Sequence, residues 1–178
     1  MFHCWSGLPQ PPVNCCKHPL AHHRLLINHN QSDTEDPGLT ELDLSNLDIS
    51  QVASDVVVGV VTKLERVVIG WCVTPDQLQA IFTRLQFGGS RLKDLTVLGG
   101  DLSAVTPEIF LGALRAVESV VFDKTTFSTD QVRSILTMQT EGSQGKLKKL
   151  EIFQPNVEDE AYDLLEAAEE NDILEIEL

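Results

Sequence analysis

Residues 92–122 read LKDLTVLGGDLSAVTPEIFLGALRAVESVVF, and this stretch decides the fold. It opens with apolar residues at Leu92, Leu95 and Val97 and closes with the same spacing at Val117, Val120 and Phe122. One residue separates the last two apolar positions of each phrase, so in an extended chain their side chains point to the same side, which predicts a short strand with one buried face. Between the phrases, Thr106-Pro107 predicts a helix start, because threonine caps a helix and proline fits its first turn.

The same phrase, L-x-x-L-x-L, occurs six times along the chain. Its copies are Leu39–Leu42–Leu44, Leu64–Val67–Ile69, Leu92–Leu95–Val97, Val117–Val120–Phe122, Leu147–Leu150–Ile152 and Ile173–Ile176–Leu178. Their starting positions, 39, 64, 92, 117, 147 and 173, lie 25 to 30 residues apart. A fixed apolar motif at such a step is typical of a solenoid, in which neighbouring repeats cover each other's apolar residues.

Each phrase is followed by a segment with a helical apolar period. Thr74 before Pro75 and Ser128 predict two further helix starts, and the carboxylates at 157–159 favour a start there. The segment 52–61 places valines at Val52, Val56, Val57, Val60 and Val61, and these β-branched residues lower its helix propensity. The other expected apolar faces are Leu78–Ile81–Phe82–Leu85, Ile109–Phe110–Leu114, Val132–Ile135–Leu136 and Ala161–Leu164–Leu165–Ala168.

The pattern resembles a leucine-rich repeat array of the longer, ribonuclease-inhibitor-like intracellular class. The family motif continues with an Asn/Cys position and a last apolar position. Cys72 fits the Asn/Cys position, whereas Leu47, Gly100, Thr125 and Pro155 occupy it elsewhere. The last position holds Ile49, Thr74, Leu102, Phe127 and Val157.

The resemblance implies an α/β solenoid over residues 37–178. It would have about five repeats plus a terminal strand, with parallel strands on a concave face and helices on a convex face. Cys72 would then lie in a core-facing position, buried and inert.

Residues 1–36 differ from the rest of the chain. They contain four prolines, an acidic run and no strand or helix period, so we expect a disordered tail with a short helix at most over 20–27. All five histidines and three of four cysteines lie there. Cys15, Cys16, His18 and His22 could ligate one metal ion, but their spacing fits no standard zinc motif. A metal-responsive tail remains an alternative to one without a selected role.

The negative charge of the chain limits the kinds of partner that we expect. The formal net charge is −14, and the last 28 residues hold 11 acids and no Lys or Arg. Such a surface repels phosphate backbones, so we expect no nucleic-acid binding; it suits a basic protein surface or simply solubility. No apolar run is long enough for a membrane span and no signal peptide is evident, so the expected location is the reducing cytoplasm.

The strand positions between the buried ones form three outward-facing columns. The first is Glu41, Arg66, Asp94, Ser119, Lys149, Glu175; the second is Asp43, Val68, Thr96, Val121, Glu151, Glu177; the third is Ser45, Gly70, Leu98, Asp123, Phe153, Leu178. The first column would pair Arg66 with Glu41 and Asp94, and Lys149 with Glu175, as a charge ladder. From these columns and the adjoining Trp71 we select candidate partner-binding residues: Arg66, Val68, Trp71, Thr96, Leu98, Val121, Asp123, Lys149 and Phe153.

These observations favour a non-catalytic protein-protein interaction module that binds through the concave face. The repeats contain no histidine, and no nucleophile, phosphate-loop or zinc-protease motif occurs, so we expect neither an enzyme nor a cofactor. By resemblance, the repeats could instead recognise ligands within a larger receptor or a ubiquitin-ligase substrate adaptor. No nucleotide-binding domain or F-box is visible in the sequence. A degenerate gene product without a retained partner is a further alternative.

Overall fold

The structure is a computed structural model that describes residues 39–141, 145–170 and 175–177. The predictions for the tail lie outside the described residues: its disorder, the helix at 20–27 and the ligand set Cys15, Cys16, His18 and His22. The predicted roles of Ile173 and Leu178 also lie outside them.

Six strands alternate with five helices along the described chain. Their bounds are β1 Glu41–Leu44, α1 Ser54–Val61, β2 Arg66–Ile69, α2 Pro75–Gln86, β3 Asp94–Leu98, α3 Pro107–Ala116, β4 Ser119–Asp123, α4 Thr129–Glu141, β5 Lys149–Phe153, α5 Asp159–Glu170 and β6 Glu175–Glu177. The strands form one sheet in the order β1-β2-β3-β4-β5-β6, and every neighbouring pair is parallel. The arrangement is therefore an α/β array of repeating strand–helix units, as the repeated phrase predicts.

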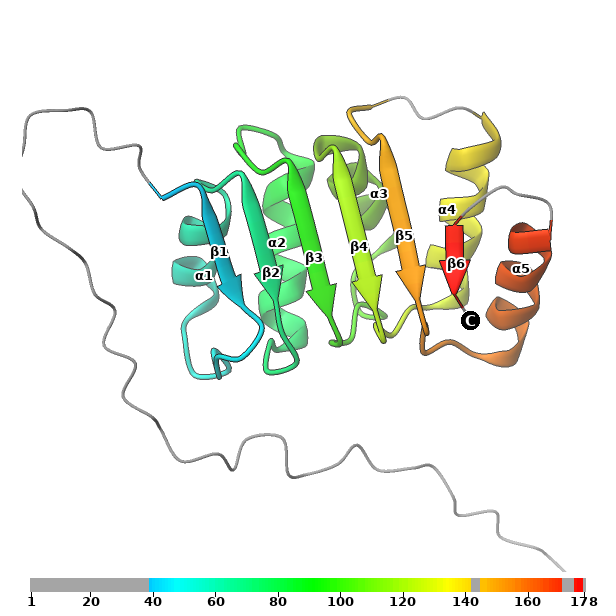
Figure 1. Cartoon of the computed structure of the whole chain (residues 1–178), viewed down its shortest axis with the longest axis horizontal. Coiled ribbons are helices and arrows are strands. Elements are labelled where there is room, and N and C mark those ends of the chain that lie inside the picture. The colour runs from blue at the N-terminus through cyan, green and yellow to red at the C-terminus, as the bar shows by residue number, and fades with distance from the viewer. Residues whose placement is uncertain (1–38, 142–144, 171–174, 178) are drawn as a thin grey trace, which may run out of the picture. The chain divides into compact units, whose positions relative to one another are not determined.

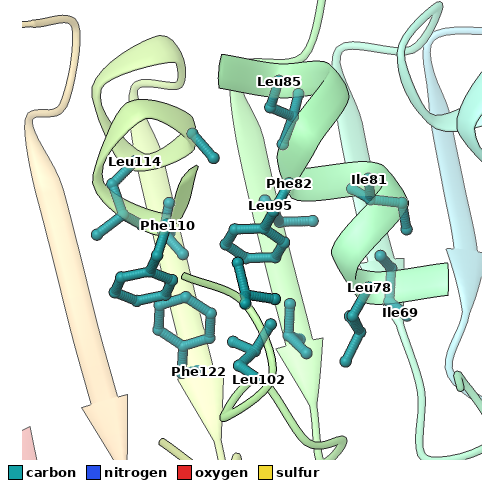
Figure 2. Close-up of a cluster of buried hydrophobic side chains, with 14 of the residues drawn as sticks. Ile69, Leu78, Ile81, Phe82, Leu85, Leu95, Leu102, Phe110, Leu114 and Phe122 are labelled. Carbon is teal, nitrogen blue, oxygen red and sulfur yellow. The ribbon is translucent and has the colours of Figure 1, made fainter. Parts of the chain in front are cut away.

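The helices lie on one side of the sheet, behind the strands in Figure 1. The apolar phrase supplies the strand side of the core between these layers: Val67, Ile69, Leu95, Val97, Val120 and Phe122 are all buried. Leu78, Ile81, Phe82 and Leu85 of α2 face them and are fully buried (Figure 2). Each unit thus covers the apolar residues of its neighbours, which is the physical requirement of a repeat array.

Aromatic rings fill the centre of this core. Phe82 of α2 and Phe110 of α3 stack with centroids 5.7 Å apart, and Phe122 of β4 lies 5.9 Å from Phe110 (Figure 2). Phe127 meets Phe122 edge-on at 5.1 Å. Three helical units are therefore joined by contacts between rings, whose geometry adds to the free energy gained from burial.

Two of the three helix caps predicted from Ser or Thr are formed. Thr74 accepts a hydrogen bond from the Gln77 amide, and the Gln77 side chain accepts one from the Thr74 amide. Ser128 and Gln131 make the same reciprocal pair at α4. Thr106 makes no such bond, so the prediction of a third side-chain cap is wrong. The residue three positions on is Ile109, which has no polar group to complete the pair.

The first unit departs from the sequence prediction. α1 forms, but only Val57 and Val61 of its five expected core valines are buried, while Val52, Val56 and Val60 are exposed. Leu39 is also exposed although it begins the first apolar phrase. The reason is topological: β1 is an edge strand, so no preceding unit within the described residues covers this side.

Two places after β2 have local structural explanations. In the second unit Val73 is buried and Thr74 is only partly so, because Thr74 serves as the helix cap. Gly70 follows β2 where the turn after β1 approaches closely: a Cβ at Gly70 would lie 2.2 Å from the Ser45 carbonyl oxygen. A residue with a side chain could not occupy this place without moving one of the turns.

Candidate protein-binding surface

The side of the sheet opposite the helices presents the candidate residues. Figure 1 views the sheet from this side, which we call the open face. Register places Arg66 beside Glu41 and Asp94, and Val68 beside Thr96, which in turn neighbours Val121. At the strand ends, Leu98 is beside Asp123, and Asp123 is beside Phe153. The structure therefore brings the candidates of the sheet into adjacent rows.

Charged residues occupy the row at the strand starts. Arg66 approaches Glu41 at 2.6 Å and Asp94 at 3.9 Å, and all three side chains are substantially exposed. Lys149 pairs with Glu151 of its own strand at 2.8 Å. The sequence places Glu175 beside Lys149 by aligning the sixth phrase with the fifth, and this register is wrong: Glu175 lies beside Glu151, two residues further along β5.

Apolar side chains occupy the rows towards the strand ends. Val68, Leu98, Val121 and Phe153 are each partly buried, and Thr96 and Asp123 lie among them with similar burial. Side chains that project from a sheet alternate between its faces, so these residues lie opposite the buried core set. Thr96 separates Val68 from Val121, and Asp123 separates Leu98 from Phe153, so apolar and polar side chains alternate across these rows.

Trp71 lies just after β2, where its ring packs against neighbouring residues and is also partly exposed to solvent. Its ring covers Gly99, where a Cβ would lie 2.4 Å from the tryptophan Cε3 atom, and Gly99 has a positive φ of 76°. The Lys124 ammonium lies 5.8 Å from the ring centroid, within the range of a cation–π contact. Half of the Trp71 surface is nevertheless exposed. Trp71 therefore packs against Gly99 and still keeps half of its surface exposed.

A second charge row, not predicted from the sequence, lies one residue before the strands. Lys93 donates to Glu65 at 2.9 Å, and Lys148 donates to Glu118 at 2.6 Å. The hydrogen bond from Lys93 lowers the pKa of Glu65, and the bond to Glu65 raises the pKa of Lys93. The bond from Lys148 likewise lowers the pKa of Glu118, with a smaller contribution from the charge of Lys93. We call Glu65, Lys93, Glu118 and Lys148 the entry ladder.

The Asn/Cys position of the motif differs from expectation. Cys72 is only partly buried, so the prediction of a buried Cys72 is wrong. Thr125 occupies the equivalent position two units later and is fully buried. Its hydroxyl lies 3.3 Å from the carbonyl oxygens of both Val97 and Gly99 in the preceding unit. A threonine thus makes the link between turns at this position, which a search for Asn or Cys would miss.

Among the residues that the structure describes, no group of three or more His, Cys, Asp or Glu side chains could hold a metal ion. None of their helices combines the length and apolar character needed to cross a membrane.

Comparison with known proteins adds no family. No protein-family model matches the chain, and no curated protein matches its sequence.

Proposed function

We propose that the chain is a non-catalytic protein-binding module that holds its partner on the open face. One observation carries the proposal: a six-stranded parallel sheet has helices on one side, while the other presents Val68, Leu98, Val121 and Phe153. Parallel sheets are ordinarily covered on both faces. A face that carries apolar side chains and that none of the described helices covers is therefore suited to being covered by another protein.

The chemistry of the open face indicates the character of the partner. Trp71 offers a large exposed ring beside the apolar rows, and aromatic anchors are enriched among residues that dominate binding energy. Glu41 and Asp94 flank Arg66, Asp123 adds negative charge at the strand ends, and the whole chain has a net charge of −14. A complementary surface would combine an apolar centre with basic residues at its border.

We also propose that the array belongs to the leucine-rich repeat class of ribonuclease-inhibitor type and acts in the cytoplasm. The sequential parallel strand order and the buried phrase residues support the class, as does the Thr125 link in the Asn/Cys position. The open face would then be the inner wall of a curved array. The cysteine usage of the sequence supports a reducing compartment.

The proposal is tested by affinity capture with the full chain as bait. The variant Arg66→Glu with Phe153→Ala alters one charged and one apolar position of the open face. Arg84→Glu with Tyr162→Ala makes the matched changes on helices α2 and α5, where both residues are exposed. We expect the open-face variant to lose partners that the helix variant retains, with at least about tenfold weaker affinity for each in direct titration. Equal capture by the two variants would refute the proposal.

Trp71 supplies a second measurement. The chain has two tryptophans, so a Trp5→Phe background leaves Trp71 as the sole indole. A captured partner that covers the open face should shift the Trp71 emission to shorter wavelength, because the exposed half of the ring leaves water. A partner that binds without changing this emission would place binding elsewhere on the molecule.

A further inference from the structure

Positive charge gathers at one edge of the array, although the chain as a whole is acidic. Because all strands are parallel, each helix leads into the next strand at the same edge, which is the upper edge of the sheet in Figure 1. From β2 to β5 this edge carries six exposed cations: Lys63, Arg91, Lys93, Arg115, Lys146 and Lys148. We call these six residues the basic edge.

Few carboxylates lie among these cations. The described residues include 11 Lys and Arg and 23 Asp and Glu. The basic edge holds six of the 11 cations, whereas the segments that lead from α1–α4 into β2–β5 contain two carboxylates, Glu65 and Glu118. Arg84 in the last turn of α2 and Glu141 at the end of α4 add one charge of each sign. The charged first residues of β2, β3 and β5 form their ion pairs on the open face.

Backbone hydrogen bonds between units bring the cations together. The Arg91 amide donates at 3.0 Å to the carbonyl of Thr62, the residue before Lys63. The Lys146 amide donates to the Arg115 carbonyl at 2.9 Å. The members of the entry ladder are joined by similar bonds from unit to unit. Neighbouring strands lie about 4.8 Å apart, so the basic edge extends about 14 Å from β2 to β5.

The array neutralises only part of this charge. Four of the six cations form no ion pair with any carboxylate that the structure describes: Lys63, Arg91, Arg115 and Lys146. Glu65 and Glu118 are already paired within the entry ladder. Arg115 lies in the last turn of α3, where a cation also favours the helix dipole, but the other three lie beyond the helix ends. The basic edge therefore keeps positive charge that an anionic ligand could use.

The surroundings of the basic edge decide what kind of anion fits. At physiological salt, exposed charges are screened beyond about 8 Å, so a ligand at this edge responds mainly to the local cations. On the β1 side, residues 39–62 contain carboxylates and no Lys or Arg, and on the other side the last 28 residues hold 11 acids and no Lys or Arg. A nucleic acid or an anionic membrane surface would extend past the edge and be repelled on both sides. A short acidic peptide segment would not.

We propose that the basic edge binds a short acidic segment of a partner protein. Carboxylates of that segment would lie along the edge, and Arg91 and Arg115 can each bind a carboxylate through two parallel hydrogen bonds. The basic edge requires a ligand of opposite charge to the basic border expected for the open face. The proposal therefore concerns a second surface, and either surface could fail without the other.

The first experiment uses two fluorescent peptides as probes. Each has about eight residues, enough to cover the edge at about 3.3 Å per extended residue. One alternates glutamate with serine, and the other has glutamine in place of every glutamate. In fluorescence anisotropy with the full chain at low salt, we expect the glutamate peptide to bind at least about tenfold more tightly, and high salt should abolish the difference. Equal binding of the two peptides at low salt would overturn the proposal.

Variants of the chain locate the site. Arg91→Gln with Lys146→Gln removes two exposed cations that form no ion pair, so the urea midpoint should stay close to that of the wild type. We expect this double variant to bind the glutamate peptide at least about tenfold more weakly. Lys124→Glu, at an exposed position after β4 on the opposite edge, makes the net charge more negative by the same amount and should bind normally. Equal weakening by both variants would show that only the total charge matters, and would overturn the proposal.

Two further measurements test the class of partner. A thymidine oligonucleotide of about eight bases should bind no more tightly than the glutamate peptide, and tighter binding would replace the acidic segment by a nucleic acid. Sedimentation velocity at low salt tests whether the acidic part of a second copy occupies the edge. We expect no dimer that depends on Arg91 and Lys146. A dimer that the double variant abolishes would replace the partner by a second copy.

Discussion

Two buried glutamines tie neighbouring units together at the scale of single residues. The Gln77 side-chain amide donates to the carbonyls of Ile49 and Val52, both at 2.7 Å. Gln131 donates in the same way to Leu102 and Val105 of the preceding unit. Each glutamine also completes the capping box of its own helix, so both ends of its amide are satisfied while it is buried.

Replacing Gln131 by methionine should therefore destabilise the protein although the volume is kept. The Val105 carbonyl loses its amide donor in the interior, and the Ser128 amide loses its acceptor, at an expected cost of about 1–3 kcal/mol. Gln79→Met, at an exposed position of α2, is the control and should change the free energy of unfolding little. Urea denaturation measures both. Equal effects of the two substitutions would show that the hydrogen bonds of Gln131 contribute nothing.

The sequence predicts the caps but not this second role of the glutamines. Thr74 and Ser128 are recognisable because a cap is a local feature, set by residues within one turn. The bonds of Gln131 to Leu102 and Val105 reach 29 and 26 residues back along the chain. They depend on how close successive units lie, which local spacing does not determine.

At the scale of elements, adjacent residues of β3 lie on opposite faces of the sheet. Leu95 is 2% exposed and faces the helices, whereas Thr96 is partly exposed on the open face beside Val68. Leu95→Asp should cost more than about 4 kcal/mol, because it places an unpaired charge in the core (Figure 2). Thr96→Asp should cost about 1 kcal/mol, the range of strand propensities. Thermal unfolding of both variants checks the difference, and similar losses would contradict the assignment of faces.

The alternation that predicts these faces also explains where the sequence prediction fails. A strand displaced by two residues keeps the same side chains on the same face, so the apolar pattern cannot detect the offset of β6. Backbone pairing alone places Ile176 beside Ile152. In α1 the periodicity is present, yet Val56 and Val60 are exposed, because a helical stripe shows which residues could be buried and not whether a neighbour exists.

At the scale of the whole molecule, the entry ladder runs across β2, β3, β4 and β5 just before each strand begins. Glu65, Lys93, Glu118 and Lys148 alternate in charge along the array. The in-strand row at Glu41, Arg66 and Asp94 could be predicted, because its members alternate with buried residues. The entry ladder lies outside the alternating positions, and only the register of the parallel strands brings its members together.

The ladder should make stability depend on pH in a defined direction. Glu65 and Glu118 have folded pKa values below the usual 4.5. Their full contribution to the free energy of unfolding is therefore present above pH 4.5. It is lost as pH falls through the lowered pKa, since protonation removes the pairing. Lys93 has a folded pKa above the usual 10.5, so its contribution is complete below that pH and is lost as pH rises through the raised pKa. The full contribution therefore spans the window between the two ordinary values.

Glu118→Gln tests this directly, because it removes the charge that binds Lys148 and attracts Lys93. The variant should have a lower urea midpoint than the wild type at pH 7, and the difference should shrink as pH falls below 4.5. Glu166→Gln, at an exposed position of α5, makes the net charge less negative by the same amount and controls for the general relief of repulsion in a chain of charge −14. High salt should also shrink the Glu118→Gln difference, because exposed ion pairs are screened. A difference that stays constant with pH and salt would mean that Glu118 stabilises the array through packing and not through its charge.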